Sequence, residues 1–218
     1  MEPVRFTTED GVSLEGELRR PEGPARAGSV LCHAHPRYGG SKDHPILWAL
    51  RNDLAGRGLA VLAFNFRGTM GSGGTYGAGR VETKDVAAAI DRIAVEKESP
   101  IVVVGWSFGA NVALRHALDD ARIRILALIG FPLEHDLDIP PTPGPTELRG
   151  LRRPVLLLSG EHDVYSPPAG VHALASSMPD ATVEIVEGTD HYLWRRERHA
   201  AAAVGSFVDR ALEPQEPV

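Results

Sequence analysis

The chain has 218 residues, of which 43% are apolar and 24% charged, as in an ordinary globular protein. Its net charge of −6 argues against a general nucleic-acid-binding surface, and no apolar run approaches the roughly 18 residues of a membrane span. A single cysteine, Cys32, excludes an intrachain disulfide and a zinc site made only of cysteines. The first residues, Met1 to Arg5, lack the basic start and apolar stretch of a signal peptide. We therefore expect a cytoplasmic protein that binds neither nucleic acid nor membrane.

The N-terminal segment predicts an antiparallel hairpin. Two strand-like runs, Val4–Thr8 and Val12–Arg19, flank a Glu-Asp-Gly sequence, and Asp-Gly between two such runs is a strong turn signal. The next stretch, Arg20–Gly28, holds two prolines and predicts a loop.

Six later segments predict the strands of a buried sheet. Near-continuous apolar runs are typical of parallel strands covered on both faces. Four segments have this character: Leu59–Phe66, Ile101–Gly105, Ile123–Ile129 and Pro154–Ser159. A short apolar segment, Ser29–His33, precedes them, and a more alternating one, Thr182–Val186, follows.

Helical patterns separate these strands. Apolar residues recur with helical spacing at positions 47, 50 and 54, at 86, 90 and 93, and at 200, 204, 207 and 211. Ser166, followed by two prolines, predicts the N-cap and first turn of a further helix. Strands that alternate with helices indicate an α/β fold with a doubly wound, mostly parallel sheet. We expect one domain over residues 1–212, no large cap and a disordered tail at 213–218.

The sequence Gly105-Trp106-Ser107-Phe108-Gly109 is the sharpest chemical signal in the chain. It follows one predicted strand directly and precedes a helix-forming stretch, which is the context that a G-x-S-x-G nucleophile elbow requires. In such an elbow the serine hydroxyl is exposed above the sheet, and the N-terminus of the helix offers free N–H groups to an oxyanion. Ser107 is therefore the candidate nucleophile.

A nucleophilic serine needs a base, and the base needs a carboxylate that orients it. Asp163 and His191 each follow a predicted strand, in the chain order serine, acid, histidine that this fold uses. Loops at the carboxyl ends of parallel strands converge on one crevice, so these residues are expected to meet. Glu161 and Asp190 remain alternatives for the acid, and Asp163 is the preferred one.

The chain resembles the α/β-hydrolase superfamily over nearly its whole length. It looks most like the small, lidless members related to dienelactone hydrolases and short-chain carboxylesterases. The segments that carry the resemblance are CHAHPRYGGSKD, FNFRGTMGSGG, VVGWSFGAN, LSGEHDVYSP and GTDHYL. The resemblance implies a serine-hydrolase mechanism with Ser107, Asp163 and His191 as the triad. Dienelactone hydrolases carry cysteine at the elbow, so Ser107 makes dienelactone chemistry a poorer match.

Two backbone N–H groups are expected to form the oxyanion hole. The first belongs to Phe108, directly after the nucleophile. The second should come from the run that begins at His35, which replaces the His-Gly-x-Gly-Gly of many relatives. That alignment points to Arg37, with Tyr38 one position away, because the proline between His35 and Arg37 has no N–H to donate.

His33, His35 and His44 do not predict a metal site. Alternating residues of a regular strand face opposite sides of the sheet, so the first two would not bind one ion together. We expect these histidines to hydrogen-bond the loops that frame the oxyanion hole, and we expect no metal and no cofactor. Three aromatic residues are candidates for substrate contact, with a core position as the alternative for the first: Trp106, Tyr38 and Tyr165.

These observations predict a serine hydrolase that cleaves small-molecule carboxylic esters through an acyl-enzyme on Ser107. The segment Phe131–Pro154 contains six prolines, which disfavour the long helical lid found in lipases of this fold. We therefore expect an open pocket and a preference for short acyl chains. The alternatives are a thioesterase, an acyltransferase or a peptidase with the same triad, or a non-catalytic binding module. The sequence does not predict the oligomeric state.

Overall fold

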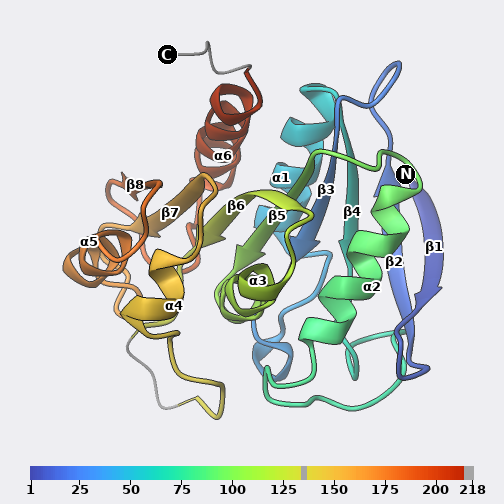
Figure 1. The fold of residues 1–218 in the computed structure, drawn as a ribbon, viewed down its shortest axis with the longest axis horizontal. Coiled ribbons are helices and arrows are strands. Elements are labelled where there is room, and N and C mark those ends of the chain that lie inside the picture. The colour runs from blue at the N-terminus through green and yellow to red at the C-terminus, as the bar shows by residue number, and fades with distance from the viewer. Residues whose placement is uncertain (134–136, 214–218) are drawn as a thin grey trace.

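The computed structural model describes residues 1–133 and 137–213, and Figure 1 shows its fold. The strands described form one sheet in the order β1-β2-β4-β3-β5-β6-β7-β8. Their bounds are β1 (Glu2–Thr7), β2 (Ser13–Arg19), β3 (Ala27–Cys32), β4 (Leu59–Phe64), β5 (Ile101–Trp106), β6 (Ile123–Ile129), β7 (Val155–Gly160) and β8 (Ala181–Val186). β1 and β2 form the predicted antiparallel hairpin, and β2 pairs antiparallel with β4. All neighbours from β4 to β8 are parallel.

Helices cover both faces of this sheet, which confirms the doubly wound α/β fold (Figure 1). Their bounds are α1 (Pro45–Gly56), α2 (Thr83–Ala94), α3 (Phe108–Asp119), α4 (Pro145–Arg149), α5 (Pro168–Ala175) and α6 (Glu197–Leu212). The apolar side chains of α1 and α6 pack on one face, and those of α2, α3 and α5 pack on the other. Between β6 and β7, the part of the chain that the structure describes forms only the short helix α4 and irregular segments, so no large cap covers this edge there.

The central strands are mostly apolar because both of their faces are covered. In β3, Val30 faces the cluster under α2 and α3, while its neighbour Leu31 faces the cluster under α1 and α6. Every residue of β5 is buried, and β5 leads directly to Ser107. The rigid core of the sheet therefore ends at the predicted nucleophile.

The predicted loop Arg20–Gly28 ends early, since β3 begins at Ala27, and hydrogen bonds explain two further predicted boundaries that are wrong. The strand predicted to reach Phe66 ends at Phe64, because the Phe66 N–H donates to His33 Nε2 instead of to a neighbouring strand. Ser166 is not the N-cap of α5, since Pro167 occupies that position and the Ser166 N–H donates to the Asp163 carboxylate. In both cases a residue predicted to serve secondary structure contacts the site.

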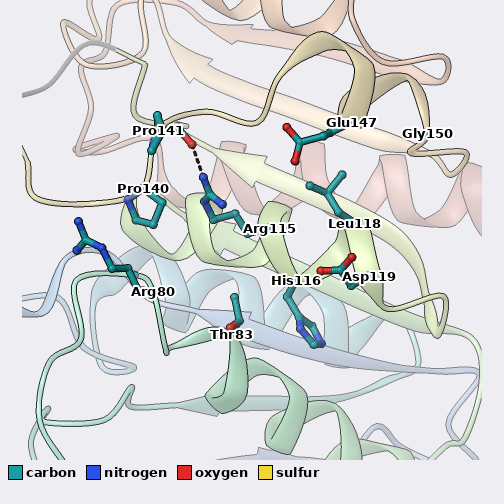
Figure 2. Close-up of a pocket in the computed structure, with 11 residues that line it drawn as sticks. Arg80, Thr83, Arg115, His116, Leu118, Asp119, Pro140, Pro141, Glu147 and Gly150 are labelled. Carbon is teal, nitrogen blue, oxygen red and sulfur yellow. Dashed lines mark hydrogen bonds between the residues drawn. The ribbon is translucent and has the colours of Figure 1, made fainter.

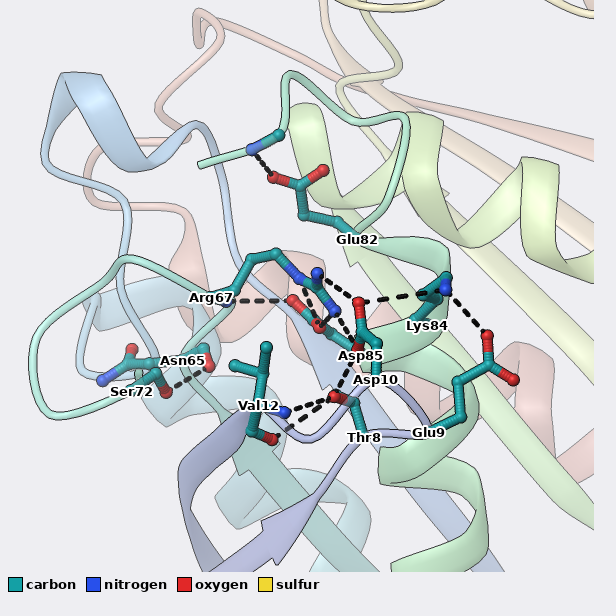
Figure 3. A network of polar contacts seen from close by, with 11 residues as sticks. Thr8, Glu9, Asp10, Val12, Asn65, Arg67, Ser72, Glu82, Lys84 and Asp85 are labelled. Atoms are coloured by element: carbon teal, nitrogen blue, oxygen red, sulfur yellow. Dashed lines mark hydrogen bonds and ion pairs between the residues drawn. The ribbon is translucent and has the colours of Figure 1, made fainter. Parts of the chain in front are cut away.

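A buried polar network holds the hairpin against α2 (Figure 3). Arg67 follows β4, and its Nε donates to Asp85 Oδ1 at 2.8 Å while its Nη1 donates to Asp10 Oδ2 at 2.9 Å. Its backbone N–H also donates to Asp85 Oδ2 at 2.9 Å. Asp85 is completely buried, and a carboxylate in that position needs a paired cation with several hydrogen bonds. The network therefore fixes the segment that leaves the carboxyl end of β4.

Two expectations concern the ends and surface of the chain. Apart from Glu213, the predicted tail at 213–218 lies outside the described residues. Within the ranges described, no helix has the length and the apolar character that crossing a membrane requires.

Candidate active site

The predicted elbow lies between β5 and α3. Ser107 has φ of 54° and ψ of −116°, a conformation that is costly for a residue with a side chain and that occurs where function requires it. A Cβ on Gly105 would overlap the backbone of Gly109, and a Cβ on Gly109 would overlap the carbonyl of Cys32. The two glycines of the motif are therefore required by the close approach of β5, α3 and β3 around Ser107.

The structure brings the three predicted triad residues together. Ser107 Oγ lies 2.9 Å from His191 Nε2, and His191 Nδ1 lies 2.8 Å from Asp163 Oδ2. All three side chains are at least nine-tenths buried. Because the carboxylate accepts at Nδ1, the neutral imidazole carries its proton there and presents a free Nε2 to the Ser107 hydroxyl. This is the arrangement in which a histidine can take a proton from a serine.

The carboxylate of Asp163 is held by its own loop. Its Oδ1 accepts the backbone N–H groups of Tyr165 and Ser166, both at 2.9 Å. The two alternative acids have other partners: Glu161 Oε2 accepts from a backbone N–H of the next loop, and Asp190 Oδ1 accepts the N–H of Tyr192. Of the three candidates, the structure therefore places only Asp163 against the histidine.

Two residues at the ends of β5 and β6 contact His191. Gly130, at the end of β6, has φ of +53°, and a Cβ there would lie 3.1 Å from His191 Cε1. The indole Nε1–H of Trp106 donates to the carbonyl oxygen of His191 at 3.3 Å. In the sequence, the one sign of a role for Gly130 is its position directly after a predicted strand. A side chain at this position would displace the imidazole.

Ser107 and His191 open onto a cavity of about 360 Å³. All three residues that the sequence suggested for substrate contact line it: Trp106, Tyr38 and Tyr165. Trp106 is also almost fully buried in the apolar cluster, so it contributes to the core and to the cavity wall together. Among the described residues that line this cavity, none is Lys or Arg.

Both N–H groups that the sequence suggested for the second oxyanion donor have hydrogen-bond partners within their own turn. The Arg37 N–H donates to His35 Nδ1 at 3.2 Å, and the Tyr38 N–H donates to the His35 carbonyl oxygen at 3.1 Å. Both predicted donors are therefore occupied, because the run folds into a tight 3₁₀ turn at Pro36–Tyr38 instead of an open loop. The N–H of Phe108 starts α3 and has no intrahelical partner.

His33 and His35 hydrogen-bond the loops of the site, as predicted. His33 Nδ1 donates to the Ala34 carbonyl oxygen at 2.6 Å, and His33 Nε2 accepts the Phe66 N–H at 3.0 Å. Burial lowers the pKa of His33 to about 4 and also lowers the pKa of His35, which Arg37 lowers further. Both imidazoles are therefore neutral acceptors near neutral pH. Within the described residues, no group of three or more metal-binding side chains is placed to hold an ion.

A second, larger cavity of about 720 Å³ lies along the far half of α3 (Figure 2). Its lining is charged and includes Arg80, Arg115, Asp119 and Glu147. Neither Ser107 nor another residue of the triad lines it. The candidate active site is therefore identified by its nucleophile and base and not by the size of its cavity.

The fold and the serine elbow together define an α/β hydrolase. A family model described as an alpha/beta hydrolase domain matches residues 27–212, and the chain belongs to this family. It is similar to an uncharacterized protein of Rickettsia prowazekii, with 24% identity over 95% of this chain and 89% of the relative.

Two solved structures resemble the chain in fold. One is an α/β serine hydrolase without lid from Xanthomonas campestris, with a TM-score of 0.81, 22% identity, and coverage of 99% of this chain and 96% of that one. The other is an esterase from Pyrococcus furiosus, with a TM-score of 0.81, 22% identity, and coverage of 97% and 92%. The resemblance inferred from the sequence is thereby confirmed at the level of the superfamily.

Proposed function

We propose that the chain hydrolyses carboxylic esters with short acyl chains through an acyl-enzyme on Ser107. The observation that carries this proposal is the hydrogen-bonded series Ser107, His191 and Asp163 at the wall of an open cavity. The P. furiosus esterase supports an ester substrate, although it is related to this chain only by fold.

The proposed reaction has two halves. Ser107 Oγ bonds to the acyl carbon and gives its proton to His191 Nε2, while the negative charge moves to the carbonyl oxygen. The ester C–O bond then breaks, and its electron pair stays on the leaving oxygen, which takes the proton from Nε2. A water molecule repeats the sequence with the acyl-enzyme, so that the acid is released and Ser107 Oγ regains a proton. Asp163 keeps the proton on Nδ1 and stabilises the imidazolium throughout.

We assign the oxyanion hole to the N–H groups of Phe108 and His35. His35 lines the cavity, its ring centroid lies 5.2 Å from that of Phe108, and no partner for its N–H is present among the described residues. Loss of one oxyanion donor costs about 10²–10³ in kcat. We therefore expect His35→Pro, which removes the N–H, to lose that much activity. The matched variant His35→Ala keeps the N–H and should lose less, and equal losses would contradict the assignment.

The cavity supports the proposed preference for short acyl chains. Each buried CH₂ contributes about 0.8 kcal/mol, but only while there is apolar surface to receive it. The volume of about 360 Å³ is modest, and the described part of the segment between β6 and β7 adds only the five-residue helix α4. We expect kcat/KM to be highest for acyl chains of roughly two to six carbons, beyond which added CH₂ groups stay in water.

The test is a panel of p-nitrophenyl esters of increasing acyl length, together with acyl-thioesters and lactones. The wild type should hydrolyse the short esters best, and Ser107→Ala should lose about 10⁶ in kcat. The matched control is Ser29→Ala on the neighbouring strand β3, because Ser29 is equally buried and its Oγ has no hydrogen-bond partner in the described residues. Retention of a few per cent of activity in Ser107→Ala would contradict the proposal. A kcat/KM that keeps rising to chains of twelve carbons would contradict the short pocket.

A further inference from the structure

Exposed aromatic side chains gather around the mouth of the catalytic cavity. Tyr38, Tyr192 and Trp194 expose 73%, 44% and 55% of their surface, and Tyr165 is also exposed. Large exposed apolar groups lower solubility and contribute little to folding, so a cluster of them at one place indicates a binding surface. Tyr38 ends the 3₁₀ turn after β3 and the other three lie in loops, all at the carboxyl edge of the sheet, where Ser107 and His191 also lie.

The rings form a continuous series that starts at the candidate base. Tyr192 meets the His191 ring edge-on with centroids 5.8 Å apart, and it stacks with Trp194 at 6.1 Å and an interplanar angle of 23°. On the other side of the base, the Tyr165 ring lies 5.0 Å from His191. Trp194 also lies 6.0 Å from the ring of His44, which lines the cavity. The series therefore leads from His191 out to the solvent.

The backbone that presents these rings is strained. Leu193 has φ of 55° and Arg195 has φ of 64°, on either side of Trp194, and neither is a glycine. Left-handed conformations at such residues cost on the order of 1 kcal/mol or more each. Leu193 is buried in the core, so it holds the segment down while Tyr192 and Trp194 project outward. Neither the strain nor the exposure stabilises the fold, which indicates that the rings have a ligand.

The proposed reaction indicates which part of the ester this ligand is. His191 Nε2 returns its proton to the leaving oxygen, so the leaving alcohol must lie beside the imidazole. Two exposed rings, Tyr165 and Tyr192, meet the His191 ring edge-on. Aromatic rings prefer offset-stacked or edge-on contacts with one another, with centroids 4.5–7 Å apart. None of the described residues that line the cavity is Lys or Arg, so the cavity offers no permanent positive charge to an anionic alcohol.

We propose that the substrate is an ester whose leaving alcohol carries an uncharged planar ring, and that this ring lies against Tyr192 and Trp194. The inference rests on the proposed esterase function and adds the class of alcohol. Tyr192 and Trp194 are then specificity-determining residues, and the acyl group occupies the other side of Ser107.

The test compares two acetates of the same acyl group and similar size. Benzyl acetate has a planar ring, whereas cyclohexylmethyl acetate has a puckered one, and both release primary alcohols. The wild type should show a kcat/KM ratio of about three to ten in favour of benzyl acetate, the range that a favourable aromatic pair supplies. Because the ratio is formed within one preparation, the fraction of folded enzyme cancels.

Variants then test which residues cause the preference for benzyl acetate. Trp194→Ala and Tyr192→Ala should bring the ratio towards one, and Trp194→Phe, which keeps a ring, should retain most of it. The matched control is Trp48→Ala, because Trp48 is 51% exposed on α1 and lines a different surface groove. A wild-type ratio near one, or an unchanged ratio in both alanine variants, would overturn the inference while leaving the esterase intact. Hydrolysis of neither acetate nor any p-nitrophenyl ester would overturn the esterase proposal and the ring preference with it.

Discussion

Two buried histidines at the carboxyl edge of the same sheet carry the proton on the same ring nitrogen but have different partners and different proposed roles. His191 follows β8 and His33 follows β3, and each carries its proton on Nδ1. At His191 that proton points to the Asp163 carboxylate and Nε2 faces the Ser107 hydroxyl. At His33 the proton points to a carbonyl oxygen and Nε2 accepts the amide N–H of Phe66.

The difference shows that the partners, and not the imidazole, decide what each histidine can do. A hydroxyl can give its proton to Nε2 when its oxygen bonds to carbon, whereas a backbone amide only shares its hydrogen. A carboxylate on Nδ1 stabilises a positive imidazolium, whereas a carbonyl does so weakly. His33 is therefore a neutral acceptor that fixes the chain after β4, and His191 is placed to be a base.

Exchange of each histidine for glutamine should separate the two roles most clearly. His191→Gln removes the base and should lower kcat by about 10⁶. His33→Gln weakens two buried hydrogen bonds and should lower the free energy of unfolding by about 2 kcal/mol, with kcat of the folded enzyme reduced far less. Ester hydrolysis and urea unfolding of both variants measure this. Loss of catalysis in His33→Gln at unchanged stability would contradict the assignment.

Asp163→Asn makes the surroundings of His191 resemble those of His33, because a neutral acceptor replaces the carboxylate. We expect kcat to fall by about 10⁴ while the fold is retained, since the amide neither stabilises the imidazolium nor selects the correct tautomer. The matched control is Glu161→Gln, because Glu161 lies two residues away in the same loop and contacts a backbone N–H instead of the base. A larger loss in Glu161→Gln than in Asp163→Asn would move the acid to Glu161.

The pH dependence of stability tests the His33 side of the comparison. Its pKa is lowered to about 4 in the folded chain, mainly by burial, from an ordinary value of about 6.5. The folded state thus favours the neutral ring. The contribution of His33 to stability is therefore complete above about pH 6.5 and is lost as the pH falls towards 4. It amounts to on the order of 3 kcal/mol in the free energy of unfolding. The free energy of unfolding, measured with urea at several pH values in this range, should change less with pH in His33→Gln than in the wild type. An equal change with pH in the two proteins would contradict this.

The sequence predicts more about the triad than about the groups around it. Ser107, Asp163 and His191 each follow a strand whose apolar pattern is clear, and the topology of a parallel sheet brings such loops together. Arg37 and Tyr38 were expected to supply an oxyanion donor, and the structure shows both N–H groups occupied. Which amide in a loop is free depends on turn geometry, and here the turn depends on the side chain of His35, whose Nδ1 accepts the Arg37 N–H.

Tertiary contacts and loop conformation explain the other gaps in the prediction. Gly130 is favoured because its φ is +53° and because a Cβ there would lie only 3.1 Å from the ring of His191, 61 positions later in the chain. Ser166 looked like a helix cap because its sequence neighbours are two prolines, yet its N–H is used by Asp163. The first outcome depends on a contact between distant segments and the second on the conformation of one loop, and propensity and spacing encode neither.

Covalent labelling with a fluorophosphonate tests the central claim most directly, because the probe reacts only with a serine that a base activates. Intact-mass measurement followed by peptide mapping should show one adduct in the wild type, on Ser107. We expect no adduct in Ser107→Ala, greatly slowed labelling in His191→Gln, and labelling near the wild-type rate in His33→Gln. An adduct that persists in Ser107→Ala, or labelling of His191→Gln at the wild-type rate, would contradict the account.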